Sequence, residues 1–374
     1  IIDEKNINEN WHKLDNQRKN LEIPTDPFIK NVTGFKTYTS SVQREALARM
    51  FFMPEGHSLV INLPTGSGKS LMFQMPILKD GLQSGLTLVV VPTTSLAIDQ
   101  ARRMNELLIQ NKISCDHPLA WYSELDETKK NLIKDNIRNG QQGILFVSPE
   151  SVVGALLPSL FIAASKGFLK YLCIDEAHLL IDWGDSFRAE YQVLTAVRNG
   201  LLHSCKEKQF KTLLFSATIT KEALVLIDNL FGPKENVHLV SGIILRPEPK
   251  YYKRFASSKI EQRKKIIELL KYVPKPVVIY TTLKKDAENI FNEIKKEKFS
   301  SIQVFHGGTK NKDEIVTQWS TDEIDIIVAT SAFGVGVDKS NVRTIIHARV
   351  PETLDRFYQE VGRSGRDGKS SNSI

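Results

Sequence analysis

Short apolar runs alternate with longer segments of helical periodicity along most of the chain. Between residues 58 and 216, five runs rich in Val, Ile and Leu have the length of buried strands, and a segment long enough for a helix separates each from the next. This alternation predicts a mostly parallel sheet flanked by helices, because parallel strands need crossover connections of that length. The predicted strands are Leu59–Leu63, Leu86–Val91, Gly143–Val147, Tyr171–Ile174 and Thr212–Phe215.

A second series of the same kind follows a basic connector that contains prolines, near Arg246–Arg254. The sequence therefore predicts two α/β domains in tandem, covering residues 35–242 and 243–374. Residues 1–34 are polar and are expected to form an extension packed on the first domain, and residues 369–373 a polar tail. The strands predicted for the second domain are Pro276–Tyr280, Ile302–Phe305, Ile324–Val328 and Thr344–His347.

The composition suits two ordinary hydrophobic cores. The 374 residues are 41% hydrophobic, and no apolar run approaches the roughly 18 residues of a membrane-spanning helix. Nothing resembles a signal peptide, so we expect a cytoplasmic protein, in the cytosol or nucleoid of a bacterium or the nucleus of a eukaryote. The three cysteines show no Cys-x-x-Cys pairing, which predicts neither a disulfide framework nor a zinc site. The net charge of +7 is a mild excess that suits a polyanionic partner.

The first chemical signal follows the first predicted strand, where residues 63–70 read Leu-Pro-Thr-Gly-Ser-Gly-Lys-Ser. A strand, a Gly-rich turn and a helix start aim backbone N–H groups at one point, which predicts a cradle for the β- and γ-phosphates of ATP. Lys69 would supply a mobile positive charge and Ser70 a hydroxyl for Mg²⁺. The alternative is an ordinary Gly-rich turn. The other predicted cradle residues are Thr65, Gly66, Ser67 and Gly68.

Two adjacent carboxylates, Asp175 and Glu176, follow the fourth predicted strand, at the same edge of the sheet as the cradle. Asp175 would hold Mg²⁺ through its water shell, and Glu176 would orient and deprotonate the water that attacks the γ-phosphate. The alternative is a solvated loop. Gln43 begins a helix upstream of the cradle and either reads an adenine edge or is an exposed helix glutamine.

Several ordered motifs together resemble those of superfamily 2 helicases. Pro64–Ser70, Asp175–His178 and Ser216–Thr218 are similar to motifs I, II and III. Ala329–Asp338 resembles motif V and Gln359–Gly368 resembles motif VI. The sequence Asp-Glu-Ala-His with an aromatic-rich loop after it is similar to the RecQ family.

The resemblance implies further nucleotide contacts. Gln43 would read adenine, Asp338 would contact the nucleotide from motif V, and Gln359 belongs to the catalytic motif VI. Arg363 and Arg366 would reach the γ-phosphate from the second domain, where a planar, always-charged guanidinium can neutralise charge on the transferred group.

The resemblance also places nucleic-acid contacts in loops that follow the strands, where hydroxyls and helix N-termini suit phosphates. Trp183 either stacks on a base or packs in the core, and Phe187 and Arg188 extend the same platform. The residues expected to contact nucleic acid are Thr93, Thr94, Ser148, Trp183, Phe187, Arg188, Thr281, His306, Thr330 and Ser331.

The sequence therefore predicts an ATP-dependent DNA helicase or translocase of RecQ type, with two RecA-like domains that hydrolyse ATP at the cleft between them. The resemblance implies 3′→5′ movement along single-stranded DNA and partly duplex DNA as a partner. An RNA helicase shares the motor motifs and stays an alternative. A second alternative is a motor-derived subunit of a bacterial DNA-modification or phage-defence complex, which would have protein partners.

Overall fold

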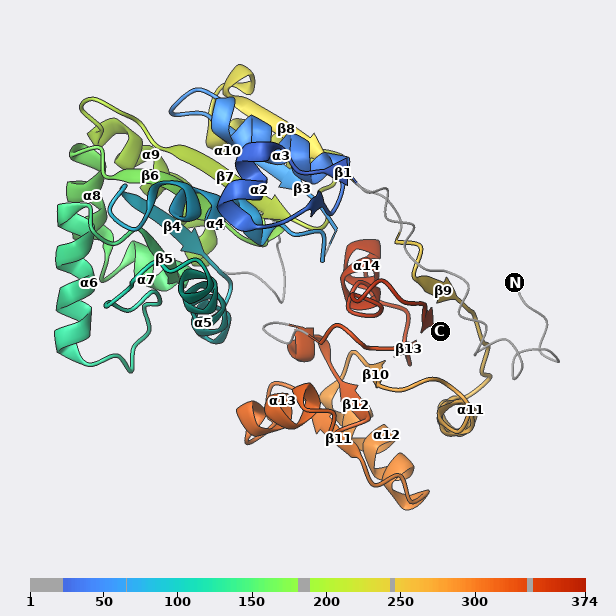
Figure 1. Ribbon diagram of the computed structural model, residues 1–374. Helices are drawn as coiled ribbons and strands as arrows, with labels where there is room; N and C mark the ends of the chain where they lie inside the picture. The colour runs from blue at the N-terminus through green and yellow to red at the C-terminus, as the bar shows by residue number, and fades with distance from the viewer. Residues whose placement is uncertain (1–22, 65, 181–188, 243–245, 335–338) are drawn as a thin grey trace. The chain divides into compact units, whose positions relative to one another are not determined.

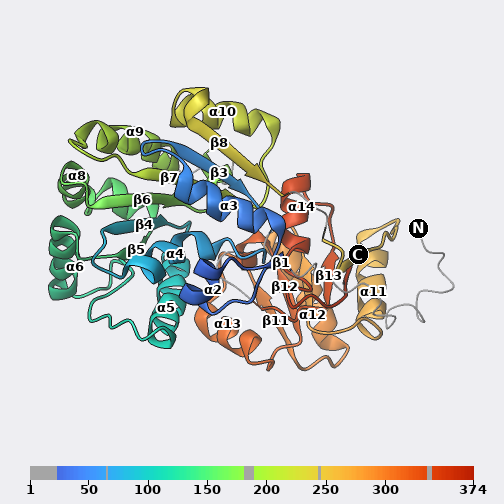
Figure 2. The ribbon, with the colours of Figure 1, turned by 45° about the horizontal axis from the view of Figure 1, so that its top comes forward.

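The computed structural model describes residues 23–64, 66–180, 189–242, 246–334 and 339–374. They form two compact units, one within Asn20–Ile243 and the other within Ile244–Ile374, called here the first and the second domain. Each domain has its own sheet with helices packed against it (Figures 1 and 2). The predicted α/β class is confirmed in both.

The first domain contains a six-stranded sheet in which all strands are parallel, in the order β5-β4-β6-β7-β3-β8. The five predicted strands are present, and β8, which the sequence analysis missed, lies at one edge. The bounds are β3 (Ser58–Asn62), β4 (Leu86–Val90), β5 (Ile144–Val147), β6 (Leu169–Ile174), β7 (Lys211–Ser216) and β8 (Val237–Ser241).

Successive residues of the central strands point to opposite faces of this sheet, and each face is covered by its own helices. Leu213 and Phe215 lie in one buried cluster, whereas Leu214 between them lies in the other. The first cluster is closed by α3 (Ser41–Phe52), α4 (Ser70–Asp80) and α5 (Thr94–Gln110). The second is closed by α6 (Glu127–Asn139), α7 (Pro149–Val153), α8 (Leu157–Ser165), α9 (Ala189–Ser204) and α10 (Lys221–Phe231).

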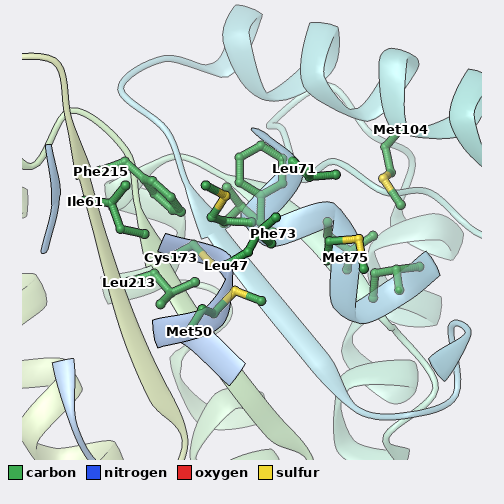
Figure 3. Close-up of a cluster of buried hydrophobic side chains, with 14 of the residues drawn as sticks. Leu47, Met50, Ile61, Leu71, Phe73, Met75, Met104, Cys173, Leu213 and Phe215 are labelled. Atoms are coloured by element: carbon green, nitrogen blue, oxygen red, sulfur yellow. The ribbon is translucent and has the colours of Figure 1, made fainter. Parts of the chain in front are cut away.

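Helix α4, which starts at the end of the predicted cradle, is fixed to the sheet by an aromatic contact. The ring of Phe73 meets those of Phe146 and Phe215 edge-on, with centroids 5.7 and 6.1 Å apart. Figure 3 shows Phe73 beside Phe215, within the same cluster as Leu47 and Met50 of α3. Edge-to-face aromatic pairs contribute about 0.5 to 1.5 kcal/mol beyond the burial of their surface.

Residues 23–38 pack on the first domain. Strand β1 (Ile23–Pro24) pairs with β2 (Thr37–Tyr38), and α2 (Pro27–Thr33) places Ile29 in the core. The hydroxyl of Tyr38 donates to Asp26 Oδ2 at 2.7 Å, which ties this segment together. Across the part of the chain that the structure describes, no helix is both long and apolar enough to cross a bilayer.

The second domain also has six parallel strands, in the order β11-β12-β10-β13-β14-β9. The four predicted strands are present with small shifts of their ends. The strands are β9 (Pro249–Tyr251), β10 (Val277–Tyr280), β11 (Ile302–Phe305), β12 (Ile326–Ala329), β13 (Thr344–His347) and β14 (Ser371–Ser373). The helices are α11 (Lys259–Leu270), α12 (Lys284–Lys296), α13 (Lys312–Ser320) and α14 (Leu354–Val361).

The expectation of a polar tail at residues 369–373 is wrong for Ser371–Ser373, which form the buried strand β14 between β13 and β9. Asn372 donates its backbone N–H to the carbonyl of Arg343 at 2.8 Å, and Ser373 accepts from the N–H of Tyr252 at 2.7 Å. The prediction failed because it scored side-chain polarity, whereas a strand is paired through its backbone. Its buried hydroxyls find partners, as the 2.9 Å contact between the Oγ atoms of Ser364 and Ser371 shows.

Replacing Asn372 by proline should destabilise the second domain by about 3 kcal/mol or more, because proline cannot donate to the β13–β14 ladder. Urea unfolding and hydrogen exchange at β13 would measure the loss. Asn372→Ala is the control, since it keeps the N–H and should cost less. Equal losses in the two variants would show that β14 matters through its side chains instead.

Candidate nucleotide-binding site

The cradle and the two carboxylates lie at the same edge of the first-domain sheet. Strand β7 lies between β3, which precedes the cradle, and β6, which precedes Asp175. The N–H of Leu63 donates to the carbonyl of Ser216 at 3.1 Å, and the N–H of Asp175 donates to that of Val90 at 2.9 Å. Because all these strands are parallel, their carboxyl ends bring the cradle, the Asp175–Glu176 pair and Ser216 together.

The cradle depends on two glycines with left-handed backbone conformations. Gly66 has φ 78° and Gly68 has φ 76°, values that cost other residues steric strain. Between them, Ser67 donates its N–H to the carbonyl of Pro64 at 3.2 Å. Helix α4 then begins at Ser70, and the first N–H groups of a helix have no intrahelical acceptor and favour an anion. Thr65 lies outside the described residues.

Gln43 packs against the cradle and is only 3% exposed. The alternative of an exposed helix glutamine is therefore wrong. Its Nε2 donates to the carbonyl of Gly68 at 3.1 Å, and its Oε1 accepts from the N–H of Thr39 at 2.9 Å. Thr39 in turn donates its hydroxyl to the carbonyl of Ser67 at 2.7 Å. A Cβ on Gly68 would come within 2.3 Å of Gln43 Nε2, so this glycine is needed for close packing too. Adenine reading by Gln43 stays a prediction.

Asp175 and Glu176 carry an electrostatic cost in the absence of a cation. Burial, and then the neighbouring charge of Glu176, raise the pKa of Asp175 to about 6, and the charge of Lys69 partly offsets the rise. The N–H of Glu176 also donates to Asp175 Oδ1 at 3.0 Å. Glu176 itself has φ 51°, an uncommon conformation for a non-glycine residue that turns the chain directly after β6.

A short chain of polar contacts links Glu176 to the end of β7, and the sequence analysis had not assigned it. His178 Nδ1 lies 3.4 Å from Glu176 Oε2 and 3.2 Å from Ser216 Oγ. Ser216 donates its single hydroxyl proton to the carbonyl of Thr218 at 2.6 Å, so it must accept from His178. This proton count assigns the Nδ1–H form to His178. Only the order of the motifs along the chain had hinted at this contact.

The charges at this edge suit Mg²⁺, which prefers one or two carboxylates together with phosphate and hydroxyl oxygens. Two adjacent carboxylates, one with a raised pKa, would be relieved by a divalent cation. Ser70 stands at the start of α4, next to Lys69. The chemistry of Asp175 and Ser70 suits the metal, and their role as its ligands stays a prediction.

In the second domain, motif VI begins in the last turn of α14 and continues into the turn after it. Glu360 is buried and accepts from His347 Nε2 at 3.0 Å and Arg356 Nε at 3.1 Å, which fixes the helix on β13. Arg363 and Arg366 are half-buried in the turn after this helix, and Gln359 lies within it. Asp338 lies outside the described residues.

In the first domain, the described residues predicted to contact nucleic acid lie at helix N-termini. Thr93 accepts from the N–H of Leu96 at 3.3 Å and so caps α5, whose first residue is Thr94. Ser148 is buried beside the start of α7, with its Oγ 3.2 Å from that of Ser151. The expected stacking residues Trp183 and Phe187, and the adjacent Arg188, lie outside the described residues.

In the second domain, the side chains of Thr281 and His306 make contacts within the domain. Thr281 donates its hydroxyl to the carbonyl of Leu283 at 3.1 Å. His306 accepts from the N–H of Gly308 through Nδ1, and its Nε2 lies 3.2 Å from Glu288 Oε1. The residues at the carboxyl end of β12 are Thr330, which is buried, and Ser331, which is exposed.

A basic hollow of about 310 Å³ opens where β10 and β13 end. Thr281 lines it, with Lys259, Arg263 and Arg349 around it. Lys259 and Arg263 are paired with carboxylates, at 3.2 Å from Asp286 and 3.1 Å from Glu293. The sequence analysis had missed these three cations because they come from separate segments.

Two protein families match the chain. Residues 40–226 match the DEAD/DEAH box helicase family, and residues 259–368 match the helicase conserved C-terminal domain. The matched regions contain the cradle, the two carboxylates and motif VI.

Curated relatives cover most of this chain. It is 32% identical over 321 residues to the probable ATP-dependent DNA helicase RecS of Bacillus subtilis, and the match covers 85% of this chain and 60% of that protein. It is 31% identical to the ATP-dependent DNA helicase RecQ of Pasteurella multocida, over 85% of this chain and 47% of the relative. It is 31% identical to the RecQ-like DNA helicase blm-1 of Caenorhabditis elegans, over 92% of this chain and 33% of that relative. The chain thus spans less than two thirds of the length of these relatives.

Solved structures share the fold. The DUF1998 helicase MrfA bound to DNA and AMPPNP superimposes with a TM-score of 0.75 at 21% identity, over 96% of this chain and 52% of that one. The DEAD-box helicase Mss116 bound to single-stranded RNA and UDP-BeF superimposes with a TM-score of 0.72 at 20% identity, over 94% of this chain and 73% of that one. At such identities the likeness concerns the fold alone.

Asp175→Asn should stabilise the nucleotide-free protein near pH 7.5. The folded state raises the pKa of Asp175 from 3.8 to about 6, so its ionised form destabilises folding above that value. The cost is much smaller near pH 4, because the folded-state group is then protonated and the unfolded-state group, with its pKa of 3.8, is only about half ionised. We therefore expect the melting temperature to rise by a few degrees at about pH 7.5 and by much less at about pH 4.

The control for this comparison is Glu207→Gln, because Glu207 lies at an exposed position in the segment before β7. It should leave the melting temperature unchanged at both pH values. A loss of stability in Asp175→Asn at pH 7.5, or a gain that does not depend on pH, would contradict the electrostatic account.

Proposed function

Because the chain belongs to the DEAD/DEAH box helicase family, we propose that it is an ATP-dependent DNA helicase or translocase of the RecQ type. The observation that carries the proposal is the meeting of the cradle, Asp175 and Glu176 at one sheet edge, in a chain whose second domain supplies motif VI. The curated relatives support DNA as the nucleic acid, since those reported above are named DNA helicases.

In this proposal the first domain binds the nucleotide. The backbone N–H groups of residues 65–70 and the ammonium of Lys69 hold the β- and γ-phosphates, and Ser70 and Asp175 hold Mg²⁺. The metal would neutralise charge on the phosphate oxygens. Glu176 accepts a proton from the attacking water, and its Oε2 lies 3.4 Å from His178 Nδ1.

The second domain completes hydrolysis in this proposal. Arg363 and Arg366 act on the γ-phosphate, where a guanidinium stabilises charge that develops in the transition state. Gln359 and Asp338 contribute from motifs VI and V. Because hydrolysis then needs both domains, the nucleotide state controls their approach, which is the basis of movement along a strand. We infer 3′→5′ movement from the RecQ resemblance.

Nucleic acid would bind through the loops at the strand ends. Thr93, Thr94 and Ser148 serve the first domain, and the second domain contributes through Thr281, His306, Thr330 and Ser331. Most of the described side chains in this set hold their own loops, so backbone N–H groups and helix N-termini make the phosphate contacts. The basic hollow near Thr281 adds positive charge to the same edge. Trp183, Phe187 and Arg188 would provide base stacking.

Single-stranded DNA should stimulate ATP hydrolysis more than duplex DNA or RNA does. Lys69→Ala should abolish ATP hydrolysis, because the ammonium that pairs with the phosphates is lost. Steady-state ATPase assays with each nucleic acid test this. Lys79→Ala is the control, since Lys79 is an exposed lysine at the other end of α4. Selective stimulation by RNA would point to an RNA helicase instead, and near-normal turnover in Lys69→Ala would refute the assignment of the cradle.

Glu176→Gln should bind ATP and Mg²⁺ but not hydrolyse ATP, because the amide cannot accept a proton from the attacking water. Equilibrium binding of ATP and single-turnover hydrolysis separate the two steps. Glu124→Gln, at an exposed loop position, serves as the control. Loss of ATP binding in Glu176→Gln would instead make Glu176 a ligand of the metal or a structural residue.

A further inference from the structure

Arg246 is a buried arginine whose guanidinium donates hydrogen bonds to the turn that carries the motif VI arginines. It is 6% exposed. One terminal nitrogen donates to the carbonyl of Gly362 at 2.8 Å and the other to the carbonyl of Gly365 at 2.6 Å. These two carbonyls flank Arg363 on both sides. The planar fork of Arg246 therefore fixes the backbone on either side of a residue proposed to act on ATP.

Glu248 provides the countercharge for Arg246. It is fully buried at 0% exposure, and its Oε2 lies 3.3 Å from Arg246 Nε. Its backbone carbonyl accepts from the N–H of Ser371 at 2.9 Å, so it also joins the turn to β14. Different atoms of Arg246 make these contacts. Its Nε faces the carboxylate of Glu248, whereas both of its terminal nitrogens donate to carbonyls of the turn.

Arg366 shares one of the same carbonyls. Its Nε donates to Gly362 at 3.3 Å, so this oxygen receives hydrogen bonds from Arg246 and from Arg366. The turn itself leaves little room for adjustment. Gly365 has φ 60°, and a Cβ there would lie 3.0 Å from the Cβ of Glu248 and 2.6 Å from the carbonyl of Lys369.

Arg363 depends on this backbone for its position. Its Nε is buried and makes no hydrogen bond to the described residues. A side chain held in this way takes its direction from its Cα, which lies between the two carbonyls that Arg246 binds. A shift of the turn would therefore displace the guanidinium that acts on phosphate.

We propose that Arg246 is a positioning residue for the motif VI arginines, and that its two-pronged contact with Gly362 and Gly365 sets the rate of ATP hydrolysis rather than the affinity for ATP. The inference rests on the proposed ATPase function. The competing explanation is an ordinary buried ion pair that only stabilises the domain. The two differ because a lysine at 246 would keep the charge opposite Glu248 but could not reproduce the planar fork.

Arg246→Lys should lower kcat of nucleic-acid-stimulated ATP hydrolysis by about tenfold or more, while KM for ATP and the Kd for single-stranded DNA stay within about twofold. The matched control is Arg198→Lys. Arg198 is 2% exposed and donates to Ser58 Oγ at 2.9 Å and Thr212 Oγ1 at 3.0 Å, at the amino ends of β3 and β7. This control should lose melting temperature but keep kcat.

Two further variants separate position from charge. Glu248→Gln keeps both carbonyl contacts of Arg246 and should lower the melting temperature with little change in kcat of the folded protein. The double variant Arg246→Gln/Glu248→Gln removes both charges of this pair and should lose kcat as Arg246→Lys does. It also serves as the test if Arg246→Lys fails to fold.

Normal kcat in folded Arg246→Lys, or in the folded double variant, would overturn the inference. An equal loss of kcat in Arg198→Lys or Glu248→Gln would also overturn it, because the loss of kcat would then result from lower stability or from the changed charge. Failure of the proposed function looks different: the unaltered protein would then show no nucleic-acid-stimulated hydrolysis at all.

Discussion

Parallel pairing of β3 with β7, and of β7 with β6, is the constraint on which the candidate site depends. It brings the ends of all three strands to one edge, although the cradle at Lys69 and the carboxylate of Asp175 are more than a hundred positions apart in the sequence. The Leu63–Ser216 hydrogen bond continues the pairing into the cradle, and the Ser216–His178 contact carries it on towards Glu176. Side chains that the chemistry needs together are thus placed by backbone hydrogen bonds that do not depend on them.

The same edge is where the first domain departs from what stability alone would favour. Asp175 has a raised pKa beside a second carboxylate, and Glu176 has a left-handed backbone. In the second domain, a buried carboxylate and a buried guanidinium, Glu248 and Arg246, stand behind the motif VI turn. Such arrangements persist when the surrounding structure holds them firmly, and here sheets and buried clusters supply that support.

Sequence patterns predicted well what depends on apolar periodicity and on glycine conformation. The core strands, the cradle and the Asp175–Glu176 pair follow from local signals, and the family resemblance is confirmed. Strand β14 was missed because its three residues are polar and its stability comes from neighbouring backbones. The roles of Gln43 and Arg246 were not predictable either, since each binds carbonyls distant in sequence.

The aromatic anchor of α4 bears on the thermodynamics of nucleotide binding. Phe73 sits edge-on between Phe146 and Phe215 one turn after the helix begins, so the end of α4 that we propose binds the phosphates is held by the core. A flexible loop loses conformational entropy when it closes on a ligand, and that loss is subtracted from the affinity. Here most of the loss is incurred during folding, so we expect phosphate contacts at this helix end to contribute to affinity almost in full.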